Sequence, residues 1–113
     1  MDSTYLINWD DFERVDMRVG RIVSVDRFPE ARKPAYRLKI DFGALGIKKT
    51  SAQVTNYTFS ELQGRQVVAV INFPVKQVGP FISEVLLLGG IDAEGKVRLL
   101  RPDPDCKLGS RVA

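Results

Sequence analysis

The sequence predicts an all-β fold: a five-stranded barrel with a short helix between strands 3 and 4 and a short N-terminal helix. Residues 35–42 alternate between apolar and polar side chains, which is the period of a half-buried strand. Other runs of strand-forming residues recur along the chain, separated by turn residues such as glycine and proline. Helix signals are confined to two short stretches, so helices contribute little to the predicted fold.

The first predicted element is a helix that starts at Asp10 and has Glu13 at its third position. It leads into a long strand over residues 17–28. The apolar phase of this strand slips after Ile22. Such a slip is expected where a strand bends through a bulge, or at Gly20, while it curves around a barrel.

The second strand covers residues 35–42 and the third covers residues 47–54. The alternation in the second strand predicts one core face and one basic solvent face. The predicted core side chains are Tyr36, Leu38, Ile40 and Phe42, and the predicted solvent side chains are Arg37, Lys39 and Asp41.

A short helix is predicted between the third and fourth strands. Thr58 and Glu61 have the spacing of a capping box, in which each side chain bonds the backbone N–H of the other residue. Tyr57 and Leu62 have the spacing of a hydrophobic staple, and Gly64 can adopt the left-handed conformation that ends a helix.

The remaining strands are predicted over residues 66–73, 84–88 and 97–101. Pro74 ends the first of these because proline has no backbone donor for a strand partner. Residues 75–82 are predicted to form a loop. About five curved antiparallel strands with one helix between the third and fourth is the layout of an OB-fold, a small barrel that often binds oligonucleotides.

Length and charge set limits on the organisation and partners of the chain. The 113 residues predict a single domain over residues 1–113. With 17 basic and 14 acidic side chains, the net charge is +3. This mild excess permits binding to a polyanion but does not require it.

Several classes of chemistry lack their usual residues. The sequence has no histidine, the commonest general base and metal ligand. It has no glycine-rich phosphate loop and no metal-ligand spacing, so no cofactor, metal or catalytic residue is predicted. The single cysteine, Cys106, and an N-terminus without a secretion signal predict a cytoplasmic protein. Apolar runs are too short to span a bilayer, so no membrane insertion is expected.

The chain resembles the tRNA-binding OB-fold domain that is appended to some methionyl- and phenylalanyl-tRNA synthetases. Within that family it is most similar to the CsaA-type secretion chaperones. The resemblance rests on sequence pieces in family order at residues 10–22, 28–43, 47–55, 67–74, 83–90 and 99–103. It implies tRNA or another structured RNA as a partner. For the CsaA-type branch it also implies a homodimer with chaperone activity toward unfolded secretory polypeptides.

The resemblance also implies which residues bind RNA. The polar patch of the family corresponds to Ser51, Gln53, Asn72, Ser83 and Glu84, and Lys48, Lys49 and Lys76 would contact phosphates. An alternative for Ser51 and Ser83 is a hydroxyl that bonds the local backbone at a strand end. The alternative for Asn72 is an amide that forms a turn.

Further cations and aromatic residues lie near these positions in the sequence. Arg32, Lys33, Arg37 and Lys39 could extend the basic face, or could be a solvated face that protects a sheet edge. Phe81 could stack on a base or contact a peptide. In many relatives the loop at residues 75–82 is richer in arginine and lysine, whereas here Lys76 is its single cation. RNA binding is therefore expected to be modest or lost.

Two apolar stretches predict self-association. Residues 67–71 and 85–88 are apolar on both strand faces, so an additional layer must cover their outer side. That layer is either the N-terminal segment or a second subunit. The resemblance favours a symmetric dimer that uses the terminal extensions, about 1–15 and 102–113. The apolar residues of the N-terminal extension are Tyr5, Leu6, Ile7 and Trp9.

Two functional classes remain open on sequence alone. The first is a non-enzymatic RNA-binding module that grips tRNA by shape, charge and a few polar contacts. The second is an export-related chaperone that holds extended apolar peptides and has little or no RNA affinity. Binding to RNA should weaken steeply with salt, whereas apolar peptide binding should not.

Overall fold

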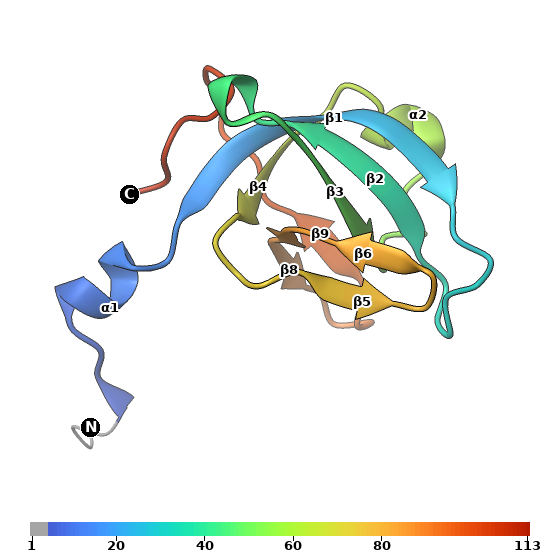
Figure 1. The fold of residues 1–113 in the computed structure, drawn as a ribbon, viewed down its shortest axis with the longest axis horizontal. Coiled ribbons are helices and arrows are strands. Elements are labelled where there is room, and N and C mark those ends of the chain that lie inside the picture. The colour runs from blue at the N-terminus through green and yellow to red at the C-terminus, as the bar shows by residue number, and fades with distance from the viewer. Residues whose placement is uncertain (1–4) are drawn as a thin grey trace.

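The computed structural model describes residues 5–113 and contains one curled antiparallel sheet with two small hairpins beside it (Figure 1). Of the predicted N-terminal extension, residues 1–4 lie outside the described part. The strand order in the sheet is β3-β2-β1-β4-β7. These strands are β1 (Met17–Arg27), β2 (Tyr36–Asp41), β3 (Ile47–Ala52), β4 (Gln66–Val70) and β7 (Leu86–Leu87). The sheet forms a nearly closed barrel, which confirms the predicted all-β OB-fold.

The predicted phase slip in β1 is a β-bulge. Ile22 pairs with Ile40 and Ser24 pairs with Lys39, so Val23 is the extra residue. Gly20 lies just before the bulge, where an added Cβ would come within 2.6 Å of Ile40 Cγ2. Its missing side chain lets the side chains of Ile40 and Phe42 pack directly against the backbone of β1.

The core lies inside the barrel, and the alternation of β2 explains how it is filled. Leu38 and Ile40 are completely buried, whereas Lys39 between them is exposed. Phe42, just after β2, is also completely buried. The core cluster comprises Ile22, Leu38, Ile40, Phe42, Val54, Tyr57, Leu62, Val67, Ala69, Val85 and Leu99.

Helix α1 (Trp9–Glu13) begins earlier than predicted. Its N-cap is Asn8, whose Oδ1 accepts a hydrogen bond from Asp11 N at 2.9 Å. The carboxylate of Asp11 in turn accepts from Asn8 N at 3.1 Å. The prediction of Asp10 as the start was wrong because Asn8 and Asp11 complete a reciprocal box whose N-cap lies two residues earlier.

Helix α2 (Phe59–Leu62) has the predicted capping box. Glu61 N donates to Thr58 Oγ1 at 3.2 Å, and Thr58 N donates to Glu61 Oε1 at 2.8 Å. Leu62 is fully buried, and Gly64 has a φ of 82°, the left-handed conformation predicted for it. A three-residue 3-10 helix at Gly43–Leu45 links β2 to β3.

The Glu61 cap predicts a specific pH dependence. The backbone N–H and the hydroxyl of Thr58 hold the pKa of Glu61 below its ordinary value of 4.5. A lowered folded-state pKa means that the stabilisation is present above the unfolded value and is lost as pH falls through the folded value. As pH falls below 4.5, the unfolding free energy of Glu61→Gln is therefore expected to decrease less than that of the parent chain. Urea unfolding between roughly pH 2 and 7 measures this change.

Glu94→Gln is the matched control, because the exposed Glu94 side chain pairs with Lys96 and accepts no backbone hydrogen bond from the part of the chain that the structure describes. An identical acid-induced loss of stability in Glu61→Gln and the parent chain would contradict the assigned role of the cap.

The segment predicted as a loop at residues 75–82 is a β-hairpin. Strands β5 (Lys76–Val78) and β6 (Phe81–Ser83) pair around Gly79 and Pro80. Gly79 has a φ of 59°, which this two-residue turn requires of its first residue. The loop prediction was wrong because the strands are only three residues long, too short for a periodic pattern.

Other predicted strands are shorter or divided. The predicted strand 66–73 ends at Val70. The predicted strand 84–88 contributes only Leu86–Leu87 to the sheet, and β8 (Gly89–Ile91) then pairs with β9 (Val97–Leu99). Gly89 permits this pairing, because a Cβ there would come within 2.6 Å of Val97 Cγ1.

The chain itself covers β4, contrary to the expectation that the N-terminal segment or a second subunit must do so. Residues 66–70 are all buried within one chain. The side-chain amide of Gln66 bonds the backbone of Cys106 in both directions, and Leu88 N donates to Val68 O at 3.0 Å. The C-terminal segment also pairs with β1, where Gly109 N donates to Val19 O at 2.8 Å.

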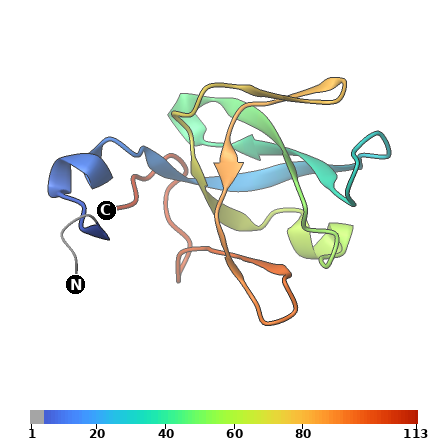
Figure 2. The same cartoon turned by 90° about the horizontal axis from the view of Figure 1, so that it is seen from below.

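The N-terminal arm projects from the barrel together with α1 (Figures 1 and 2). The side chains of Tyr5, Leu6, Ile7 and Trp9 are 63–78% exposed. No helix in residues 5–113 has the length and apolar character needed to cross a membrane.

Candidate nucleic-acid interface

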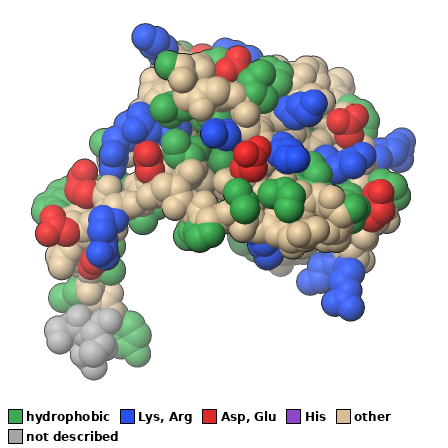
Figure 3. Space-filling view, viewed as in Figure 1, with side chains coloured by type: hydrophobic (Ala, Val, Ile, Leu, Met, Phe, Trp, Pro, Cys, Tyr) green, Lys and Arg blue, Asp and Glu red, His purple; other side chains and the backbone are tan. Residues whose placement is uncertain are grey.

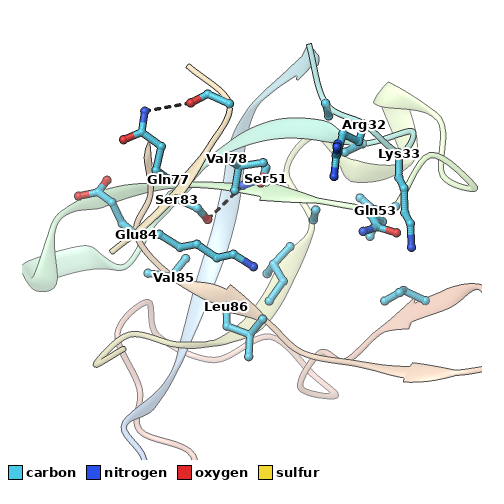
Figure 4. A pocket seen from close by; sticks show the side chains of 18 of the residues that line it. Arg32, Lys33, Ser51, Gln53, Gln77, Val78, Ser83, Glu84, Val85 and Leu86 are labelled. Atoms are coloured by element: carbon cyan, nitrogen blue, oxygen red, sulfur yellow. Dashed lines mark hydrogen bonds between the residues drawn. The ribbon is translucent and has the colours of Figure 1, made fainter. Parts of the chain in front are cut away.

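An open cleft of about 1380 Å³ lies between β3, the loop before β2, the β5–β6 hairpin and the β7–β9 region (Figure 4). It brings together residues that are far apart in the sequence. The predicted site residues that line it are Arg32, Lys33, Ser51, Gln53, Lys76, Ser83 and Glu84. The predicted residues that do not line it are Arg37, Lys39, Lys48, Lys49, Asn72 and Phe81.

The Ser83 hydroxyl is engaged within the protein. Thr50 Oγ1 lies 2.7 Å from Val85 O, to which it donates, and 2.9 Å from Ser83 Oγ. Because Thr50 has one hydroxyl hydrogen, Ser83 donates the hydrogen bond between the two hydroxyls. Ser83 Oγ also accepts from Ser51 N at 3.4 Å. The local hydrogen-bonding alternative therefore describes Ser83.

Glu84 joins the end of β6 to β3. Its backbone N donates to Lys49 O at 2.8 Å, and its Oε1 accepts from Lys49 N at 3.0 Å. This reciprocal pair positions the β5–β6 hairpin beside β3, where the two elements form one wall of the cleft. Glu84 thus shapes the cleft, with its second carboxylate oxygen left unbonded in the described part of the chain.

Six polar side chains at the cleft have no hydrogen bond or ion pair to another residue within 5–113, and one of them is the carboxylate of Glu30. Ser51 and Gln53 offer a hydroxyl and an amide from the same face of the chain, because they are two residues apart at the end of β3. Arg32, Lys33 and Lys76 offer cations. Figure 4 shows Arg32, Lys33 and Gln53 at one end of the cleft, with Ser51 nearer the hairpin. The cleft can thus hydrogen-bond a neutral polar group and attract anions at the same time.

Asn72 has a structural role away from the cleft. Its Oδ1 accepts from Asp16 N at 3.0 Å, and its Nδ2 donates to Arg14 O at 2.7 Å. These bonds fasten the residues before β1 to the end of β4. Asn72 is thus a structural amide, but the predicted alternative of an amide that forms a turn is wrong, because its backbone partners lie across the sheet and not in its own turn.

Lys48 and Lys49 are neighbours on β3, so their side chains point to opposite faces. They do not form one patch. Lys49 lies with Arg37, Lys39 and Phe81 around a second, smaller hollow outside the cleft. The Phe81 ring packs against Phe28, with the ring centroids 5.5 Å apart.

The sequence prediction missed the apolar part of the cleft. Phe73, Leu86 and Ile91 line it and are 54%, 49% and 68% exposed. The available signal is the run at residues 85–88, which is apolar on both strand faces, although the sequence predicts a covered outer side for it. The cleft is therefore lined by apolar as well as polar side chains. No group of three or more metal-ligating side chains occurs in residues 5–113.

A family model described as "Putative tRNA binding domain" matches residues 17–111. The chain belongs to this family. The match includes both walls of the cleft. Among curated proteins, methionine–tRNA ligases of Pyrococcus abyssi and Porphyromonas gingivalis are 38% and 33% identical to the chain over 94% of its length. The chain spans only 14% and 15% of these ligases.

Two solved structures match the chain over nearly the full length of both proteins. The CsaA chaperone protein from Picrophilus torridus is 50% identical, with a TM-score of 0.91, and the alignment covers 96% of this chain and 100% of that one. The chaperone CsaA from Bacillus anthracis is 47% identical, with a TM-score of 0.90 over 96% and 99%. These likenesses confirm the predicted resemblance to the tRNA-binding and CsaA-type proteins.

Proposed function

We propose that this protein binds tRNA, or RNA of similar structure, in the cleft and performs no chemistry on it. The observation that carries the proposal is the cleft itself. It presents Ser51, Gln53 and three cations, Arg32, Lys33 and Lys76, without partners in the described chain, and it lies within the region matched by the tRNA-binding family.

Each of these groups suits a different part of RNA. Hydroxyl and amide groups can bond base edges or the ribose 2′-hydroxyl, which distinguishes RNA from DNA. Lysine and arginine attract the phosphates, whose neutralisation releases counterions and makes binding sensitive to salt. With few cations on the hairpin, we expect moderate affinity. A tRNA ligand also agrees with the proposed cytoplasmic location.

A second candidate function is a chaperone for unfolded secretory polypeptides. Exposed Phe73, Leu86 and Ile91 along the cleft favour it, because apolar side chains of an extended peptide can pack there. Among residues 5–113, strand β5 pairs only with β6, so its other edge can accept a peptide strand. The likeness to CsaA chaperones supports the same function.

We propose that the working form is a homodimer. Tyr5, Leu6, Ile7 and Trp9 are exposed on an arm that lies away from its own barrel. Consecutive exposed apolar side chains of this kind mark an interaction surface. A twofold dimer would bury both arms and would place two clefts on one particle, which raises avidity for a large RNA.

The proposal is tested by titrating the purified protein with bulk tRNA over a salt series, with duplex DNA of equal length as the control. Micromolar or tighter, salt-sensitive binding that prefers RNA is the expected result. Absence of tRNA binding even at low salt, together with salt-insensitive binding of an unfolded polypeptide, would replace the RNA function with the chaperone function.

A further inference from the structure

The second hollow, of about 290 Å³, is lined by more cationic than anionic side chains. It lies between the side chains of β2 and β3 and the start of β6, and is lined by Asp26, Arg37, Leu38, Lys39, Lys49 and Phe81. Three cations and one carboxylate leave a net charge of +2 around it. Figure 3 shows lysine and arginine side chains gathered over this part of the molecular surface.

The pairing of β2 with β3 places two lysines beside each other at this hollow, where their charges repel. Lys39 lies directly opposite Lys49 in the antiparallel pair. Like charges in this position destabilise a sheet. In the described chain, neither lysine forms an ion pair, and the Asp26 carboxylate accepts only from Ser24 Oγ at 3.4 Å. Asp26 lies opposite Arg37 in the β1–β2 register, so the positive charge that remains without a counterion in the described chain is that of Lys39 and Lys49.

Two of the three cations make cation–π contacts with aromatic rings. Lys49 Nζ lies 5.4 Å from the ring centroid of Phe81, and Arg37 Cζ lies 5.6 Å from that of Phe28. The two rings pack against each other, as described above. A ring attracts a cation through its quadrupole but does not neutralise it, as a carboxylate would. The rings thus orient both cations and leave their charge available to a ligand.

We propose that this hollow binds a phosphodiester of the RNA backbone, with Lys39 and Lys49 as its contacts. An anion between the two ammonium groups would remove their repulsion. Lys49 and Ser51 lie on the same face of β3, roughly 7 Å apart along the strand, so one RNA segment can reach both the hollow and the cleft. This inference rests on the proposed RNA-binding function. Phe81 acts in it as a positioning residue for Lys49.

The test compares tRNA affinity over a salt series for the parent chain and Lys39→Gln/Lys49→Gln. Lys96→Gln/Lys107→Gln is the control, since it removes the same charge from residues that line neither the hollow nor the cleft. Each lost phosphate contact should lower the magnitude of the negative slope of log affinity against log salt by about 0.9 and weaken binding roughly tenfold near ~0.1 M salt. The slope of the control should equal that of the parent. The melting temperature of Lys39→Gln/Lys49→Gln should be unchanged or higher, because a like-charge pair is removed.

The outcomes separate this inference from the proposed function. If the parent binds tRNA and Lys39→Gln/Lys49→Gln has the parent slope, the phosphate site is overturned and binding in the cleft stands. If the parent does not bind tRNA at all, both are overturned.

Phe81→Leu tests the positioning role, because leucine keeps an apolar contact with Phe28. It should weaken tRNA binding in the parent chain and have no further effect when Lys49 is glutamine. Equal losses in both backgrounds would mean that Phe81 contacts RNA itself and would overturn its role as a positioning residue.

Discussion

Trp9→Ala is expected to weaken self-association by roughly 30- to 1,000-fold, the effect of removing an interface residue worth about 2–4 kcal/mol. Trp9 is 77% exposed in the single chain, where its aromatic neighbour is Phe12 in the same helix. Its large apolar surface is therefore available to a partner. Sedimentation or mass photometry over a dilution series measures the change.

Ile47→Ala is the matched control, because Ile47 is also a large exposed apolar residue, 59% exposed, but lies at the start of β3, away from the arm. It should leave the dimer intact. Since Trp9 packs on no core residue, the unfolding free energy of the monomer at high dilution should be the same in Trp9→Ala and the parent. A parent chain that is monomeric, or a Trp9→Ala dimer as tight as the parent, would contradict the proposed role of the arm.

Arg32→Glu with Lys33→Glu is expected to weaken tRNA binding roughly a hundredfold or more near ~0.1 M salt. Both residues line the cleft from the loop before β2, and both are exposed. Reversal removes two attractions and adds two repulsions with phosphate. The magnitude of the negative slope of log affinity against log salt should fall by about 2, because two phosphate contacts are lost.

Lys96→Glu with Lys107→Glu changes the net charge by the same amount at residues outside the cleft. This control should lose much less affinity. A similar loss in both double variants would show that tRNA responds to overall charge and not to the cleft. Melting temperatures near the parent value would establish that neither variant is unfolded.

Local rules explain which parts of the fold were predictable. The alternation in β2, the phase slip in β1 and the Thr58–Glu61 box each depend on residues close in sequence, and the structure confirms all three. The β5–β6 hairpin and the division after Leu87 were not predicted. Strands of two or three residues carry too few positions for a period, and their pairing is decided by tertiary contacts.

The predicted polar site residues have different roles in the structure, for a similar reason. Residue type suggested that Ser51, Ser83 and Asn72 were equivalent short polar groups. In the structure, the Ser83 and Asn72 side chains bond within the protein, whereas the Ser51 hydroxyl has no partner in the described chain. Which polar groups are already satisfied depends on long-range neighbours such as Thr50 and Asp16, and a single sequence does not specify these contacts.

The most direct test of the cleft as the RNA site is an NMR titration of the ¹⁵N-labelled protein with tRNA, following backbone amides. The account predicts that the largest changes fall on residues 30–33, 51–53 and 76–84 and saturate with one common affinity. The 3-10 helix at Gly43–Leu45, which does not line the cleft, should remain unchanged. Changes confined to that helix or to the C-terminal segment, or no changes at low salt, would contradict binding in the cleft.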